Sequence, residues 1–65
     1  GALRFIASNA KGTNRDIFAP NVLLAPSGEI VVKADSPAYA ELSFDLSFNV
    51  GNSGEAALII DGRAV

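Results

Sequence analysis

Residues 38–50 read AYAELSFDLSFNV, and apolar side chains stand at every even position of this stretch. Polar side chains stand at the odd positions, and only Tyr39 interrupts that series. Successive side chains of a β-strand point to opposite faces, so a strand would gather the large apolar residues on one face, whereas a helix would scatter them. The alternation therefore predicts a β-strand over residues 40–50.

The first half of the same stretch has a second interpretation. Ser36 is a typical helix N-cap, and Pro37 suits the first position of a helix because its missing N–H needs no partner there. The residues AYAEL follow directly. A short helix that begins at residue 37 therefore remains the alternative to the first part of the strand.

A hairpin turn is indicated upstream by Pro26, Ser27 and Gly28. Proline fixes its φ at about −65°, and glycine adopts positive φ without steric cost, which is the chemistry of tight turns. The flanking residues 22–24 and 30–32 are apolar, and the second arm is rich in β-branched side chains that favour strands. We therefore expect these two arms to pair, with a positive φ at Gly28.

The two ends of the chain add weaker signals. Residues 2–8 alternate imperfectly and predict a strand, whereas the polar residues 9–15 indicate a loop. The apolar pair that follows is ended by Pro20, which has no N–H to donate in a central strand. After a turn at residues 51–54, residues 56–60 form a nearly continuous apolar run that suits a strand covered on both faces.

The dipeptide Asp61-Gly62 has two interpretations. It is either a hairpin turn that leads into a last short strand, or a β-bulge at Gly62.

These signals together predict one small all-β domain, residues 1–65, built as an antiparallel meander, a half-sandwich or a barrel of about five strands. The expected strands are residues 2–8, 21–25, 29–34, 40–50 and 55–61. The expected core consists of Leu3, Phe5, Val22, Leu24, Ile30, Val32, Leu42, Phe44, Leu46, Phe48, Val50, Leu58 and Ile60.

The composition excludes several chemistries, because the chain contains no Cys, His, Met or Trp. Disulfide scaffolds, Cys/His zinc sites, thiol nucleophiles and histidine-based acid–base catalysis all need residues that are missing. Five basic and seven acidic residues give a net charge of −2, with no basic run. We therefore expect no enzyme, no cofactor, no nucleic-acid partner and no membrane partner.

The remaining polar candidates have plainer explanations. The serines have only Lys11 and Lys33 as bases, without a supporting motif. Glu41 and Asp45 would lie about 13 Å apart on the expected strand, wider than the pairs of about 5 to 9.5 Å that glycosidases use. Calcium could recruit oxygen ligands from Asn14, Asp16, Asp61, or Asn52 with Glu55, but the spacing of an EF-hand is absent. A sugar-stacking platform would need Tyr39, Phe5 and Phe18.

The balance of 49% hydrophobic against 18% charged residues favours a non-enzymatic structural or assembly module. Such a module would be a small β subunit or fragment of a larger protein array, such as a virion, a fibre or a surface layer. A virion or an extracellular surface is the expected setting, although no targeting pattern fixes it. The alternative is a β module that binds carbohydrate or an extended peptide, the latter through an open strand edge. Because the chain opens with Gly1 rather than Met, we expect a processed product, an excised fragment or a tag remnant.

A length argument predicts association with another protein. A straight strand over residues 38–50 would span about 43 Å, whereas a compact domain of this size has a radius of gyration near 11 Å and a diameter of about 28 Å. The apolar face of that strand would then extend onto another chain. We therefore expect a homo-oligomer or a larger partner assembly. Its expected interface residues are Leu42, Phe44, Leu46, Phe48 and Val50.

Overall fold

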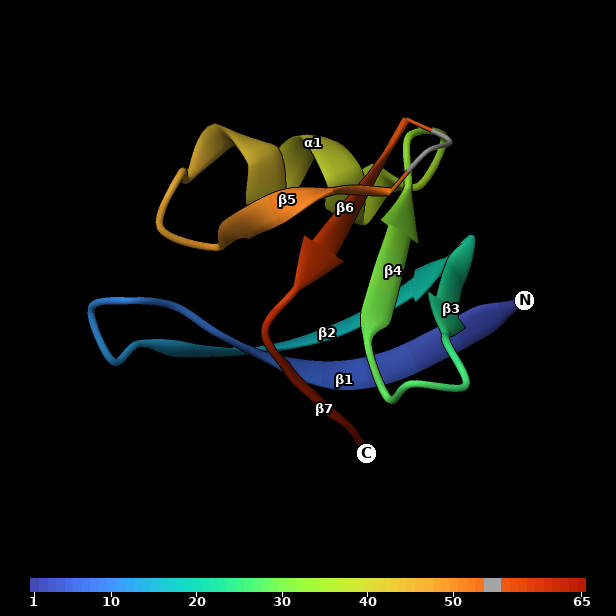
Figure 1. Ribbon diagram of the computed structural model, residues 1–65, viewed down its shortest axis with the longest axis horizontal. Helices are drawn as coiled ribbons and strands as arrows, with labels where there is room; N and C mark the ends of the chain where they lie inside the picture. The colour runs from blue at the N-terminus through green and yellow to red at the C-terminus, as the bar shows by residue number, and fades with distance from the viewer. Residues whose placement is uncertain (54–55) are drawn as a thin grey trace.

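The computed structural model describes residues 1–53 and 56–65, without the side chains of residues 49, 50, 52 and 53. Its strands and single described helix form two antiparallel sheets with the helix packed against both (Figure 1). The elements in chain order are β1 (Ala2–Ser8), β2 (Asn14–Pro20), β3 (Val22–Leu24), β4 (Ile30–Lys33), α1 (Pro37–Phe44), β5 (Asn49–Ser53), β6 (Ala57–Ile60) and β7 (Gly62–Ala64).

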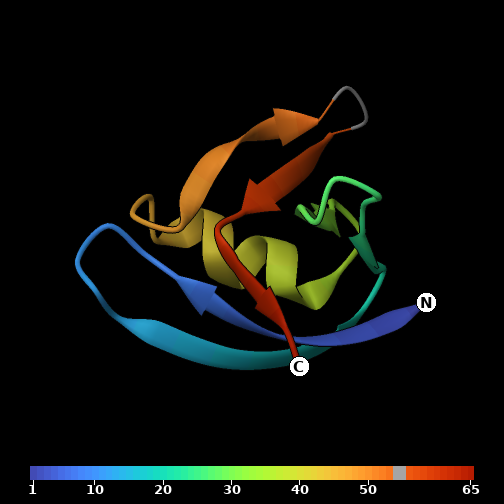
Figure 2. The same ribbon diagram turned by 60° about the horizontal axis from the view of Figure 1, so that its bottom comes forward.

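The predicted all-β class is confirmed, and its architecture is two facing sheets rather than a closed barrel. One sheet has three strands in the order β2-β1-β7, and the other has four in the order β3-β4-β6-β5. The helix α1 lies against β2, β4 and β6, between the β1–β2 hairpin and the β5–β6 hairpin (Figure 2). Buried residues from both sheets and the helix form a single core.

The β1–β2 hairpin places one face of the three-stranded sheet in the core. Phe5 lies opposite Ile17 and Leu3 opposite Ala19, so these alternate positions point inward. The strand β2 begins at Asn14, inside the residues 9–15 that the sequence predicts as a loop, and it extends to Pro20. The sequence does not predict this strand, because Pro20 argues against a central strand. In the structure Pro20 is tolerated because it stands at the last position of β2, where the β1–β2 ladder needs no N–H.

The second hairpin confirms the predicted turn and its pairing. Val22 lies opposite Val32, and Leu24 lies opposite Ile30. The turn closes with the Gly28 N–H donating to the carbonyl of Ala25 at 2.8 Å, and Gly28 has a φ of +91°. The positive φ expected at this glycine is therefore confirmed.

The long strand expected over residues 40–50 is wrong, and the helical alternative is confirmed for its first half. The Ser36 hydroxyl accepts a hydrogen bond from the Ala38 N–H at 3.3 Å, and Pro37 occupies the first turn of α1. Ala38 and Leu42 share the buried face of the helix because they are four residues apart, a spacing that also fits alternation. A turn over residues 45–48 then separates α1 from β5.

The core agrees with most of the predicted set. The confirmed members are Phe5, Val22, Ile30, Val32, Leu42, Phe48, Leu58 and Ile60. Leu3 is half-buried against this core, and the Val50 side chain lies outside the described residues. The prediction is wrong for three exposed residues, which are Leu24, Phe44 and Leu46. Its omissions include Ala7, Ile17, Ala19 and Ala38.

The single chain has the dimensions of a compact domain. The Cα radius of gyration is 10.2 Å and the longest extent is 27 Å. The accessible surface of 3884 Å² equals the value of about 3,900 Å² expected for a compact monomer of this mass. The length argument for association therefore fails, because the strand that would overrun the domain does not exist. Any association must rest on local surface features.

The last strand connects the two sheets. After β6 the chain crosses to the three-stranded sheet, where β7 pairs with β1, so Asp61-Gly62 leads into a last short strand but not into a hairpin with β6. A Cβ on Gly62 would lie 2.0 Å from the Ile6 carbonyl oxygen. Only glycine allows this close approach of the two backbones.

Candidate interaction surfaces

The predicted interface residues are divided between the core and the surface. Leu42 and Phe48 are completely buried within the chain, so neither reaches a partner in this conformation. Phe44 is 93% exposed and Leu46 is 78% exposed, one at the end of α1 and the other in the turn that follows. Val50 lies in β5, and its side chain is outside the described residues.

The turn that carries Leu46 is held by hydrogen bonds. The Asp45 carboxylate accepts from the Ser47 hydroxyl at 2.6 Å and from the Ser47 N–H at 3.1 Å. These bonds favour the ionised carboxylate, so the pKa of Asp45 lies below its ordinary value of 3.8. The Ala10 N–H also donates to the Ser47 carbonyl at 3.3 Å, which fastens the β1–β2 loop to the turn.

A second apolar surface lies on the outer face of the three-stranded sheet. Phe18 on β2 is 73% exposed and lies opposite Arg4, and Val65 lies on the other side of Arg4 with 68% exposure. The guanidinium of Arg4 binds both oxygens of Asp16, at 3.1 and 2.7 Å. This pairing lowers the pKa of Asp16 and raises the pKa of Arg4, chiefly through the shared hydrogen bonds.

The outer edge of β2 carries backbone groups that β1 does not use. The Ser8 N–H donates to the Asp61 carbonyl at 2.8 Å, and the Val65 N–H donates to the Arg4 carbonyl at 2.9 Å. The even-numbered backbone groups of β1 therefore face β7, and its odd-numbered groups face β2. By the same alternation, the N–H groups of Asn14, Asp16 and Phe18 point away from the sheet.

These outward groups have no hydrogen-bond partner in the part of the chain that the structure describes. The edge of β2 is therefore an open ladder next to the exposed Phe18. Sequence reasoning missed this feature because β2 was not recognised. The available signal was the alternation of the inward Ile17 and Ala19 with the outward Asp16, which the exposed Phe18 obscures.

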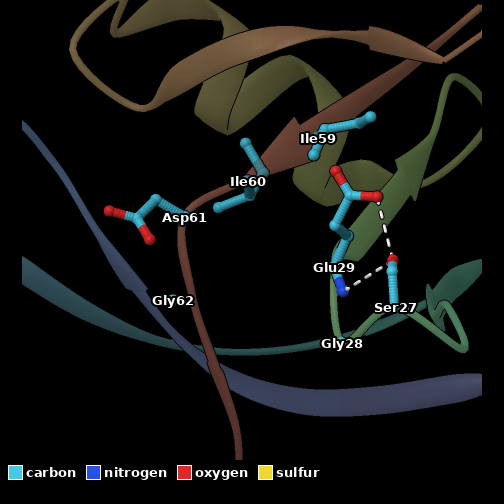
Figure 3. A pocket seen from close by; sticks show the side chains of 7 residues that line it. All are labelled: Ser27, Gly28, Glu29, Ile59, Ile60, Asp61 and Gly62. Atoms are coloured by element: carbon cyan, nitrogen blue, oxygen red, sulfur yellow. Dashed lines mark hydrogen bonds between the residues drawn. The ribbon is translucent and has the colours of Figure 1, made fainter.

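A shallow hollow of about 400 Å³ lies where the β3–β4 turn meets the junction of β6 and β7 (Figure 3). The Ser27 hydroxyl donates to Glu29 Oε1 at 2.9 Å, and the Glu29 N–H donates to the same hydroxyl oxygen at 3.4 Å. Glu29 and Asp61 both line the hollow, but the Asp61 carboxylate points away from that of Glu29 (Figure 3). The two acids therefore do not converge on a common ligand position.

The other candidate sites of the sequence do not assemble. Phe5 is buried and Phe18 is exposed, while Tyr39 packs against the core, so these three rings form no sugar-stacking platform. Glu41 pairs with Arg15, whereas Asp45 bonds with Ser47, which gives each carboxylate a structural partner.

The acidic side chains also remain apart from one another. Among the described residues no three His, Cys, Asp or Glu side chains are grouped as metal ligands. Of the expected calcium ligands, Asp16 is bonded to Arg4, and Glu55 lies outside the described residues.

Three comparisons with known proteins find no match for this chain, whether among protein-family models, curated proteins or solved structures. Within the described residues, no helix is long and apolar enough to cross a membrane. The function is therefore inferred from the surfaces described above.

Proposed function

We propose that this chain is a non-enzymatic assembly module, a small β subunit that associates with copies of itself within a larger protein array. The observation that carries the proposal is the exposure of large apolar side chains on a domain whose core is already complete. These residues are Phe18, Leu23, Leu24, Phe44, Leu46 and Val65. Several of them lie on ordered elements, where they offer fixed contact area to a partner.

Electrostatics and side-chain chemistry support the same proposal. A net charge of −2 gives little long-range repulsion between copies. Every buried side-chain polar atom in the described part of the chain has a hydrogen-bond partner, so the described core holds no polar group that would need a ligand. Protein contacts are the use to which this surface is best suited.

The experiment is sedimentation velocity over a range of protein concentrations up to about 1 mM, a range that captures weak association. The proposal expects the mean mass to rise above the monomer mass of 6.7 kDa as concentration increases. A mass that stays at the monomer value throughout would overturn it.

The open edge of β2 favours a second candidate function, the binding of an extended peptide as an added strand. In that case the chain would stay monomeric alone, and its β2 amide resonances would shift only when a foreign peptide is added. The same concentration series therefore separates the two functions.

A further inference from the structure

The geometry points to a specific self-association surface: β2 of one copy pairs edge to edge with β2 of a second copy, antiparallel, with Ile17 opposite Ile17 of that copy. This inference rests on the proposed function and names the surface and the register through which it acts. In one copy β2 is the outer strand of its sheet, next to β1 (Figure 2). The dimer would therefore contain one continuous sheet in which the two β2 strands are central. Three strands from each copy give a sheet of ordinary size.

The backbone groups on the outer edge of β2 favour this pairing. The outward N–H groups of Asn14, Asp16 and Phe18 lie on one edge of a seven-residue strand, and no described segment forms a hydrogen bond to that edge. An edge of this length is a template for another strand. Pro20 interrupts it only at its last residue, where a carbonyl is still available to accept a hydrogen bond.

The charged side chains of β2 also permit this pairing. Soluble β proteins commonly guard such edges with charged side chains that would have to be desolvated on pairing. The two charges of β2 are partly compensated, because Asp16 is paired with Arg4 and Arg15 is paired with Glu41 of α1. Each counter-charge lowers the cost of bringing a second strand near, but two Asp16 carboxylates placed directly opposite each other still repel.

Hydrogen bonding and charge together fix the register of the two β2 strands. With Ile17 opposite Ile17, the N–H of Asn14 meets the carbonyl of Pro20 from the second copy, and Asp16 and Phe18 exchange hydrogen bonds across the junction. Every outward N–H of β2 is then used. A shift in one direction sets Asp16 opposite Asp16, which like charges disfavour. A shift in the other direction leaves the Asn14 N–H without a partner.

The outer face becomes continuous in this register. Phe18 lies opposite Asp16 of the second copy, whose own neighbour across the next strand pair is the half-buried Ile6. The exposed ring therefore faces Asp16 and, one strand further, the half-buried Ile6 of the second copy, while its backbone completes the ladder. A generic peptide offers the ladder but not this reciprocal arrangement, so the second copy is the occupant that fits.

The test compares two lysine substitutions by sedimentation. Phe18→Lys places a charge on the edge, and Phe44→Lys places the same charge at another exposed site away from it. Both side chains are solvated, so both variants should keep the native fold, which NMR dispersion would verify. We expect Phe18→Lys to raise the dimer dissociation constant at least about tenfold and Phe44→Lys to change it less than about twofold.

Amide hydrogen exchange gives a direct readout of the edge. As concentration rises, the amides of Asn14, Asp16 and Phe18 should gain protection, while those of Ile17 and Ala19 are protected at every concentration. In a mixed-isotope dimer, the Hα of Arg15 should lie close to the Hα of Ala19 from the other copy, because their Cα atoms would be about 4.5 Å apart.

The outcomes separate the two levels of the proposal. Association that Phe44→Lys abolishes and Phe18→Lys leaves intact would overturn the β2 interface while the assembly function stands. A wild-type chain that is monomeric at about 1 mM would overturn both. A monomeric chain whose even-numbered β2 amides are protected by an unrelated extended peptide would assign the edge to a foreign partner and also overturn self-pairing.

Discussion

Gly28 and Gly62 both hold a positive φ, but they require glycine for different physical reasons. At Gly28 an added Cβ would meet nothing within 4 Å, so the only cost is the backbone conformation at a φ of +91°. At Gly62 the same Cβ would lie 2.0 Å from the Ile6 carbonyl oxygen, so the β1–β7 backbones would have to separate. The two positions therefore separate conformational cost from steric cost.

We predict that Gly28→Ala lowers the free energy of unfolding by about 1 kcal/mol, because an L-residue resists positive φ. Gly62→Ala should cost several times more, about 3 kcal/mol or above, since a strand pairing is also lost. Urea denaturation measures both. Gly28→Asn is the control, because asparagine tolerates positive φ and should be milder than alanine. Equal losses for the two alanine variants would contradict this assignment.

The lowered pKa values of Asp45 and Asp16 predict a loss of stability in acid. A carboxyl whose pKa is depressed in the folded state contributes stability above its unfolded value, and this contribution is lost as pH falls through the folded value. The urea concentration at the midpoint of unfolding should therefore decrease as pH falls below 3.8. Asp45→Asn, which keeps an acceptor for Ser47, should show a smaller decrease. An identical pH dependence in the variant and the wild type would refute this explanation.

At the scale of the element, α1 gives the sharpest test of secondary structure. Leu42 is completely buried and Phe44 is almost completely exposed, although they are only two residues apart. We predict that Leu42→Ala costs about 2 to 5 kcal/mol, whereas Phe44→Ala stays within about 0.5 kcal/mol. Thermal or urea unfolding measures both. In a strand the two side chains would share one face, so similar losses would restore the strand interpretation.

The cap of the same helix supports a separate prediction. The nearly buried Ser36 accepts from the Ala38 N–H, and Ser36→Ala should lower the free energy of unfolding by about 1 kcal/mol. Ser43→Ala, in the last turn of α1, serves as the control and should have little effect. A chain that tolerates both changes equally would not depend on the cap.

Particular elements show what the sequence could predict. The β3–β4 turn and the pairing of its two arms can be predicted because Pro26 and Gly28 encode the turn locally. The sequence favours a strand over α1 because Ala38 and Leu42 satisfy both the two-residue and the four-residue period. Only the capping residues Ser36 and Pro37 distinguish the two structures, and their signal is shorter than the alternation that follows.

The candidate interface was harder to predict than the fold. Phe44, Leu46 and Phe48 look equivalent in sequence, but the outer face of α1 exposes Phe44, and the turn that follows exposes Leu46 and buries Phe48. The open edge of β2 depends on which strand lies beside it, a long-range property that no local pattern encodes.

At the scale of the whole molecule, β7 holds the two sheets together. Without it β1 would have only β2 as a neighbour, and an isolated two-stranded hairpin is marginally stable. We predict that deletion of residues 62–65 greatly lowers the urea midpoint and exposes the Ile6 amide to exchange. Arg63→Ala keeps every backbone bond of β7 and should stay within about 0.5 kcal/mol of wild type. An unchanged midpoint after the deletion would show that the sheets hold together without β7.

The pairing of β1 with β7 also sets an order of events for the folding chain. The β1–β2 and β3–β4 hairpins close between near neighbours in the sequence, whereas β1 and β7 come from opposite ends and pay the entropy of the longest loop. We therefore expect the local hairpins to form first and the docking of β7 to be late. During that interval β1 is open on one side and β2 on the other, so the unfinished chain exposes two template edges. Pairing between different chains then competes with the docking of β7 on β1. The rate at which residues 62–65 reach β1 therefore determines the fraction of chains that reach the native fold.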